Sequence, residues 1–260
     1  MKVEELIIYP IKSLQGIKVP SAQVEEKGLQ YDRRWMLVDE QGVFITQRKN
    51  PELSQLQIAM GNEKIEVRSG NSSVEVPLIG ELDESLGVQI WDAQLNAYKA
   101  KTEINEWFST VLKRKCSLVY MPEKSSERLI DKNTVSFADE YPYLLLGEES
   151  MNDLNTRMES PLPIYRFRPN IIFSGGKPYE EDNWRKFSIG NISFEGIAPC
   201  IRCVFTTIDQ QTGKMGKEPL KTLSTYRNVG KGVVFGLHAT VLSTGTIRAG
   251  DQISVQSKKS

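Results

Sequence analysis

Two of the three cysteines in this 260-residue chain lie close together in the segment APCIRC, residues 198–203. Cys200 and Cys203 could form a redox-active disulfide, bind a metal ion together, or have separate roles. Redox dithiols of the thioredoxin type lie at the amino terminus of a helix, where the helix dipole lowers the thiol pKa. The residues that follow here, VFTTID, are β-branched and predict a strand instead. The spacing therefore does not favour a redox dithiol.

A zinc site shared by the two cysteines has equally little support. Zinc usually takes four protein ligands at a structural site, and the other soft candidates are Cys116 and His238, the one histidine of the chain. In an extended segment, Cys200 and Cys203 point to opposite faces, while Cys200 and Arg202 share a face. A nearby cation favours the thiolate, the form that attacks substrates or ligates metals. Two interpretations stay open: two ordinary buried cysteines, or an active Cys200 beside a Cys203 that is packed away.

Basic residues occur in several short segments that could meet at one ligand. In YRFRPN, an extended chain would place Arg166, Arg168 and Asn170 on one face. The other candidates are Lys12 and Ser13 in PIKSLQG, Arg33 and Arg34 in YDRRWM, and Arg48 in TQRK. Arginine forks and a lysine–serine pair suit an anionic, phosphate-bearing small molecule. A solvated strand face remains the alternative for YRFRPN, and no glycine-rich nucleotide loop is present.

The elements that must position these residues are mostly short strands. Segments with β-branched runs or alternating charge and valine or isoleucine predict strands near residues 4–13, 34–48, 63–78, 168–175, 185–209 and 232–256. Apolar residues at helical spacing predict a helix around residues 104–112, and a second helix begins near Gly147. We expect a mainly β fold with a few helices, divided into an N-terminal β-barrel-like domain (1–115) and a second β-barrel domain (116–260).

The composition narrows the possible partners and location. Charge is balanced, with 33 basic and 33 acidic residues and a pI near 6.7, so nucleic acid is not an expected partner. The first residues, MKVEELIIYPIKSLQG, fit neither a signal peptide nor a membrane span. An odd number of cysteines fits a reducing compartment. We therefore predict a cytoplasmic protein with no membrane partner.

Taken in order, seven segments resemble a known family. They are YPIKSLQG, GLQYDRRWMLVDEQG with TQR, FADEYPYLLLGEESMNDLN, FRPNIIFSGGKPYEEDNW, APCIRCVFTTIDQQTG, KEPLKTLSTYR and GTIRAGD. Together they resemble MOSC proteins, and within these the subgroup with an N-terminal MOSC β-barrel domain. That subgroup includes the mitochondrial amidoxime reducing component and its bacterial relatives. The resemblance runs from about residue 2 to about residue 255.

The resemblance implies a molybdenum cofactor, Mo-molybdopterin, bound between the two domains. It implies that Cys200 is the metal ligand and that Lys12, Ser13, Arg33, Arg168 and Asn170 hold the pterin and its phosphate. Arg202, which shares a face with Cys200, is included among the cofactor-binding candidates. Asp139 is a candidate catalytic proton donor or pterin contact, with an acidic turn residue as the alternative. Glu140 and Tyr141 stand where the mitochondrial proteins carry small hydroxyl residues, so those hydroxyl contacts are not expected.

The implied activity is reduction of N-hydroxylated compounds, such as hydroxylamines and amidoximes. Some bacterial relatives carry a fused ferredoxin-type domain, and three cysteines are too few for its cluster, so we expect none here. Electrons are therefore expected from a separate protein of flavin, iron–sulfur or haem type. Two alternatives stay open: a protein that binds or carries the molybdenum cofactor without turnover, and a cofactor-free β-barrel interaction module.

Overall fold

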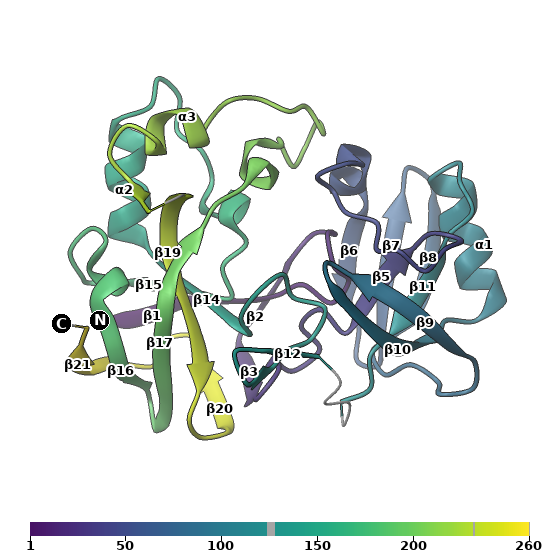
Figure 1. The fold of residues 1–260 in the computed structure, drawn as a ribbon, viewed down its shortest axis with the longest axis horizontal. Helices are drawn as coiled ribbons and strands as arrows, with labels where there is room; N and C mark the ends of the chain where they lie inside the picture. Colours follow the sequence, from purple (N-terminus) through teal and green to yellow (C-terminus); the bar gives the residue numbers. More distant parts are fainter. Residues whose placement is uncertain (124–127, 231, 260) are drawn as a thin grey trace.

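Most of the alternating apolar segments form short strands, which build two lobes (Figure 1). The structure is a computed structural model that describes residues 1–123, 128–230 and 232–259. We call the lobe around the longest sheet the C-terminal lobe. The lobe that holds residues 35–120 is the N-terminal lobe. The predicted mainly β fold is confirmed.

The C-terminal lobe is built on a nine-stranded sheet with the order β2-β1-β15-β14-β19-β17-β16-β21, to which β18 adds beside β19. The strand bounds are β1 Lys2–Ile8, β2 Ile17–Val19, β14 Tyr143–Gly147, β15 Ile171–Ser174, β16 Trp184–Ile189, β17 Ile192–Ile201, β18 Asn228–Val229, β19 Gly232–Val241 and β21 Ile253–Lys258. Its main core contains Trp184, Phe187 and Phe194, each almost fully buried. Burial of such large rings is the main stabilising contribution to a lobe of this kind.

The N-terminal lobe contains two smaller sheets and one long helix. A four-stranded sheet has the order β5-β11-β10-β9, and a three-stranded sheet has the order β6-β7-β8. The bounds are β5 Trp35–Val38, η1 Pro51–Gln55, β6 Gln57–Met60, β7 Lys64–Ser69, β8 Ser72–Pro77, β9 Ser85–Ile90, β10 Ala93–Lys99 and β11 Ser117–Tyr120. Helix α1, Thr102–Val111, buries Ile104 and Phe108, as the apolar spacing predicted.

The remaining elements are short. They are β3 Ser21–Glu25, β4 Gly28–Leu29, β12 Leu129–Ile130, β13 Asn133–Thr134, α2 Glu148–Thr156, η2 Ile164–Phe167, η3 Glu180–Asn183, η4 Val204–Thr207, α3 Leu220–Leu223 and β20 Gly245–Arg248. Strand β20 pairs with β3, which in turn pairs with β4, and β12 pairs with β13. Helix α2 begins directly after Gly147, its amino-terminal cap, as predicted.

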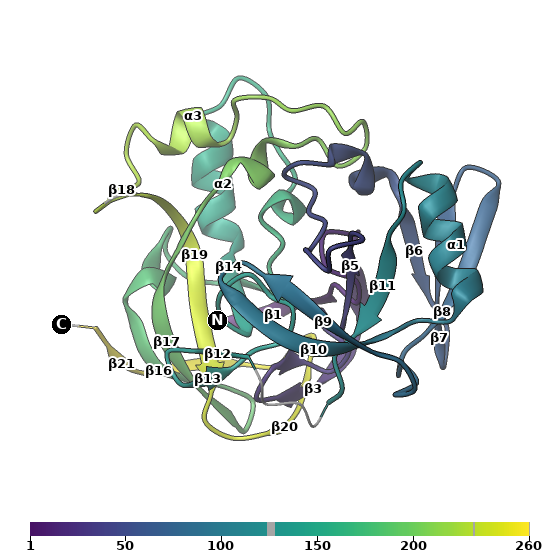
Figure 2. The same cartoon turned by 45° about the vertical axis from the view of Figure 1, so that its right-hand side comes forward.

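Strand pairing crosses the predicted domain boundary in both directions. The first strand, β1, lies antiparallel to β15 and so belongs to the C-terminal lobe. Strand β11, which follows residue 115, pairs with β5 and β10 in the N-terminal lobe. Figure 1 shows β1 beside β15 in the C-terminal lobe, and the turned view in Figure 2 shows the N-terminus on the side of that lobe. The division at residue 115 stays a prediction. Residues 9–16 connect two strands of the C-terminal lobe, β1 and β2, and residues 30–34 lead from β4 to β5 in the N-terminal lobe.

Two predicted local conformations are wrong. VFTTID does not continue as a strand, because Val204–Thr207 forms the 3-10 helix η4. YRFRPN is not extended either, since Ile164–Phe167 forms η2 and Arg168 adopts a left-handed backbone with φ of 56°. The turn η2 directly precedes Arg168, and the turn η4 directly follows Cys203. For short segments of this kind, tertiary contacts determine the backbone conformation more strongly than strand propensity does.

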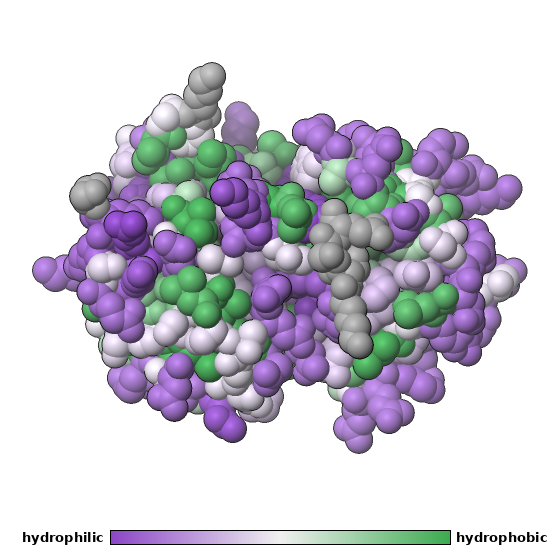
Figure 3. All heavy atoms as spheres, turned by 60° about the horizontal axis from the view of Figure 1, so that its bottom comes forward, coloured by the Kyte–Doolittle hydropathy of each residue, from purple (hydrophilic) through white to green (hydrophobic). Residues whose placement is uncertain are grey.

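In the described part of the chain, no helix has the length and apolar character needed to cross a lipid bilayer. On the face of the molecule shown in Figure 3, hydrophilic side chains dominate and the hydrophobic ones form separate small patches. That face therefore presents no continuous apolar surface.

Candidate functional site

A cavity of about 710 Å³ lies where the lobes meet. All eight site residues predicted from the sequence line it: Lys12, Ser13, Arg33, Asp139, Arg168, Asn170, Cys200 and Arg202. They come from connections between strands, from the segment after η2 and from the end of β17. The fold therefore brings together residues that are far apart in the sequence.

Cys200 lies on one wall of the cavity, near the end of β17, and is 6% exposed. Arg202 Nη1 donates a hydrogen bond to Cys200 Sγ over 2.8 Å, and Arg202 Nη2 donates to the Phe167 carbonyl. Burial alone would raise the pKa of the Cys200 thiol, but the Arg202 and His238 cations outweigh it and lower the pKa. The shared face expected for Cys200 and Arg202 is thus present, and it favours a thiolate.

His238 and Glu140 complete this wall, which we call the thiol wall. His238 lies on β19, beside β17, and its Nδ1 is 3.1 Å from Glu140 Oε2. Burial would lower the pKa of His238, but Cys200 and Glu140 raise it to about 9. At neutral pH the imidazole is therefore a cation beside the sulfur. In the described residues no group of three or more His, Cys, Asp or Glu side chains could hold a metal ion by itself.

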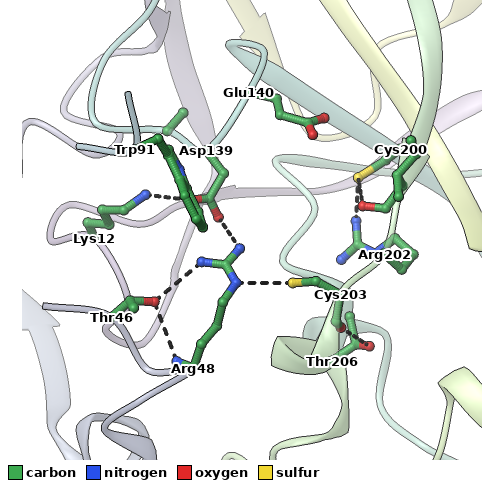
Figure 4. Close-up of polar contacts among 12 residues, drawn as sticks. Lys12, Thr46, Arg48, Trp91, Asp139, Glu140, Cys200, Arg202, Cys203 and Thr206 are labelled. Carbon is green, nitrogen blue, oxygen red and sulfur yellow. Dashed lines mark hydrogen bonds and ion pairs between the residues drawn. The ribbon is translucent and has the colours of Figure 1, made fainter. Parts of the chain in front are cut away.

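Asp139 is the centre of the opposite wall, which we call the carboxylate wall (Figure 4). Its carboxylate accepts hydrogen bonds from Lys12 Nζ at 2.6 Å, Arg48 Nη2 at 2.9 Å and Trp91 Nε1 at 3.2 Å. Partial burial would raise the pKa of Asp139, but Lys12 and Arg48 hold it well below its usual range. The carboxyl group is thus ionised at neutral pH and poorly suited to donate a proton.

Lys12 is buried on the same wall. Its Nζ also donates to the Phe137 carbonyl over 2.8 Å. Burial lowers the pKa of Lys12 to about 8, although Asp139 opposes this shift. Without Asp139, a lysine in this position would therefore lose charge readily.

A further part of the cavity is formed by Arg33 and Arg168, which both lie over the Tyr9 ring, and by Asn170, which contacts Arg33. Arg33 Nη1 donates to Asn170 Oδ1 at 3.1 Å and pairs with Asp32, and the guanidinium lies 4.4 Å from the Tyr9 ring centre. Arg168 stacks on the same ring at 4.0 Å and donates to the Leu14 carbonyl. Burial lowers the pKa of Arg168 to about 10. Two guanidinium groups are thus held together within a largely buried region.

Backbone strain accompanies this arrangement. Ser13, Arg33 and Arg168 have positive φ values of 69°, 51° and 56°. Side chains other than glycine adopt this region rarely, and such residues concentrate at binding sites where the surroundings hold them. Ser13, Arg33 and Arg168 are all cavity residues. No sequence pattern predicts these three backbone conformations.

Three further expectations need correction. Arg166 does not share a face with Arg168, because the turn of η2 directs it to Asp209, 2.7 Å away. Arg34 pairs with Glu25 and Glu123, and it is not a cavity residue. Cys203 is not packed away, because it precedes η4, lines the cavity, and its Sγ accepts a hydrogen bond from Arg48 Nε over 3.1 Å.

Sequence reasoning missed several cavity residues. His238 was considered only as a zinc ligand, and Glu140 only as a departure from a family pattern. Trp91 at the β9–β10 turn and Arg128 before β12 gave no sequence signal, although both line the cavity. Arg48, in the segment TQRK, is one of the basic candidates from the sequence, but it is not among the residues expected to hold the cofactor.

Comparisons with known proteins show the family of the chain. Residues 1–115 match the family model of the MOSC N-terminal beta barrel domain, and residues 132–254 match that of the MOSC domain. Mitochondrial amidoxime-reducing component 1 of Mus musculus is 32% identical over 275 residues, which cover 96% of this chain and 81% of that protein. The chain belongs to the MOSC family.

Other MOSC relatives carry different names. Mitochondrial amidoxime reducing component 2 of Bos taurus is 32% identical over 275 residues, covering 96% of this chain and 82% of that protein. Molybdenum cofactor sulfurase of Oryza sativa subsp. japonica is 33% identical over 262 residues, covering 90% of this chain. The match spans only 32% of the sulfurase's length. Together with the match to the MOSC domain, these relatives point to an association with the molybdenum cofactor.

The charges in the cavity fit an anionic group such as a phosphate-bearing pterin. Within the described residues, Arg128, Arg168 and Arg202 line the cavity without an ion pair to a carboxylate. The buried Nε atoms of Arg128 and Arg202 also have no hydrogen-bond partner. Arg202 faces the Cys200 sulfur, whose lowered pKa favours the anionic thiolate, but Arg128 and Arg168 have no such counter-charge in the described chain. Buried cations without a counter-charge are costly. An anionic ligand would offset this cost, so the donor set fits the cofactor that the family implies.

Proposed function

We propose that this protein binds the molybdenum cofactor in the cavity between the lobes and reduces N-hydroxylated compounds, such as hydroxylamines and amidoximes. The observation that carries the proposal is the thiol wall: a Cys200 thiol with a lowered pKa faces a cavity that contains three arginines without carboxylate partners among the described residues. A soft thiolate suits molybdenum, and the arginines suit the phosphate of the pterin.

In this proposal the site residues predicted from the sequence have separate roles. When bound, the cofactor supplies two-electron redox chemistry at its metal. Cys200 Sγ is the metal ligand, and Arg202 Nη1 orients that sulfur by the 2.8 Å hydrogen bond. The residues that hold the pterin and its phosphate are Lys12, Ser13, Arg33, Arg168, Asn170 and Arg202.

The task proposed for Asp139 changes from the one expected. Its low pKa and its two ion pairs argue against a proton donor. We assign it instead to position the Lys12 ammonium and the Arg48 guanidinium, both of which it contacts directly. Asp139 would then act on the ligand through these cations.

The partners remain part of the proposal. The substrate is a small N-hydroxylated compound, and a separate redox protein of flavin, iron–sulfur or haem type supplies electrons. A cytoplasmic location rests on composition alone.

A direct experiment tests the assignment of Cys200. Wild type and Cys200→Ala are purified from a host that makes molybdenum cofactor, and molybdenum content is measured together with benzamidoxime reduction by reduced viologen. We expect Cys200→Ala to lose more than about 100-fold in activity, because even residues behind a metal ligand contribute 10- to 100-fold. Cys203→Ala is the matched control and keeps its molybdenum. A Cys200→Ala protein with full metal and full activity contradicts the proposal.

Carrying the cofactor without turnover is the second candidate. The match to the plant molybdenum cofactor sulfurase, at 33% identity over 262 residues, supports this candidate, although it spans only 32% of the sulfurase's length. The same purification separates the two candidates. A carrier would contain molybdenum that depends on Cys200, yet would reduce no N-hydroxylated compound with any donor.

A further inference from the structure

Trp91 stands in an unusual backbone conformation at the mouth of the cavity. Ile90 and Ala93 pair directly across β9 and β10, so Trp91 and Asp92 form a two-residue turn. Trp91 has φ of 52°, a region favoured by glycine and asparagine in such turns and rare for bulky side chains. A non-glycine residue in this region costs stability, so other contacts must hold it there.

Three contacts hold the indole over the cavity. Its Nε1 donates to Asp139 Oδ1 at 3.2 Å, the Phe44 ring packs on it with centroids 5.0 Å apart, and the Arg48 guanidinium lies 4.9 Å from its centroid. Figure 4 shows the indole beside Asp139, facing the space between the two walls. The ring is thus fixed in orientation, as a binding surface requires.

Trp91 nevertheless remains 42% exposed, unlike the residues deeper in the cavity. Lys12, Ser13, Asn170 and Cys200 are each at most 6% exposed. At the mouth, Leu129 is also exposed, and Tyr141 lines the same region. The cavity therefore changes from a buried, mostly cationic interior to an exposed rim that carries Trp91 and Leu129 together with the carboxylates of Asp92 and Glu140. A ligand that arrives from solvent meets the mouth first.

We propose that the Trp91 indole is the stacking surface that selects flat, conjugated N-hydroxylated substrates, such as aromatic amidoximes, over non-planar ones. This inference rests on the proposed reductase function. The deep cations are assigned to the cofactor, which leaves the exposed ring for the substrate. Stacking of a planar group on a fixed indole adds affinity beyond simple burial and depends on the flatness of the ligand.

Binding can be measured without turnover. Trp91 is one of four tryptophans, and Trp35 and Trp184 are almost fully buried. Benzamidoxime added to the cofactor-loaded protein is expected to quench the tryptophan emission. The quench should persist in Trp107→Phe, because Trp107 lies on α1 and bonds to Ser72, away from the cavity. It should disappear in Trp91→Phe, which removes the fluorophore at the site.

Selectivity gives the second measurement. Benzamidoxime is compared with cyclohexanecarboxamidoxime, which has a similar size but no flat ring. In Trp91→Leu the KM preference for benzamidoxime should fall by roughly threefold to tenfold, and Trp91→Phe should retain most of it.

Three results would overturn the inference. These are an equal effect of Trp91→Leu on both substrates, a quench that persists in Trp91→Phe, and a lowered pterin content in Trp91→Leu, which would assign the indole to the cofactor. If wild type reduces neither amidoxime, the proposed function fails. The loss or persistence of the quench still decides whether Trp91 binds the flat ligand.

Discussion

The cations on the two walls of the cavity differ in their partners. On the carboxylate wall, Lys12 and Arg48 are neutralised within the protein by Asp139. On the thiol wall and beside it, Arg202 and Arg168 donate only to a sulfur and to backbone carbonyls. Lys12 and Arg48 thus share one carboxylate, while Arg168 and Arg202 have no carboxylate partner among the described residues and remain available to a ligand. This difference separates residues that shape the cavity from residues that hold its occupant.

Among the variants that test this difference, Arg168→Met should have the largest effect, which is on cofactor retention. The variant removes a cation that lacks a carboxylate partner, and we expect cofactor retention to weaken by about 10- to 100-fold. The measurement is pterin and molybdenum content after dialysis. Arg166→Met is the matched control, two positions away in the same motif, because Arg166 pairs with Asp209. It should lose stability and keep its cofactor, and equal cofactor loss in both variants would remove the distinction between the walls.

Asp139→Asn should have a smaller effect, on stability. Breaking a buried ion pair costs about 3–5 kcal/mol; the Asp139 side chain is 42% exposed, so solvent screening reduces the expected loss to about 1–2 kcal/mol at pH 7. The measurement is urea denaturation. Asp92→Asn, an exposed cavity residue without an ion pair in the described chain, should leave the free energy of unfolding unchanged.

The pH dependence of this variant has a definite sign. The pKa of Asp139 is lower in the folded protein than its ordinary value of 3.8. Its contribution to stability is therefore present above the unfolded pKa and is lost as pH falls through the folded pKa. Wild type and Asp139→Asn should differ at pH 7 and converge in acid. A constant difference down to pH 2 would show that the ion pairs do not cause the loss.

The smallest effect should be seen in thiol reactivity without cofactor. Iodoacetamide at pH 7.5 should label Cys200 faster than Cys116, because Arg202 and His238 lower the pKa of Cys200 while burial raises that of Cys116. Arg202→Met should slow labelling of Cys200 by about threefold to tenfold. Mass spectrometry of peptides gives the rates. If labelling of Cys200 does not change, Arg202 does not act on the sulfur.

Local sequence patterns predicted most elements but not how they pair. The spacing of Ile104 and Phe108 was enough for α1, and the alternation in 63–78 was enough for the β7–β8 hairpin. The pairing of β1 with β15 could not be predicted, because a local sequence pattern does not identify which distant strand will be the partner. The turn at η4 was missed because its β-branched residues have high strand propensity whatever the tertiary contacts.

For the site, residue types carried more information than predicted geometry. The extended-chain argument correctly placed Cys200 beside Arg202, but it failed for Arg166, since the left-handed Arg168 follows a turn. His238 and Trp91 reach the cavity through sheet register and a hairpin turn. Their contribution depends on tertiary structure, which the spacing of a single sequence does not contain.

The position of β1 in the C-terminal lobe has a consequence for synthesis. The first strand leaves the ribosome long before its partner β15, so it must wait for residues 171–174 before its backbone can pair. Contacts this distant in sequence slow folding. The segment with Lys12 and Ser13 follows directly after this strand, so the cavity cannot form in a partly synthesised chain that lacks β15. Cofactor loading is therefore expected only after translation has passed the second lobe.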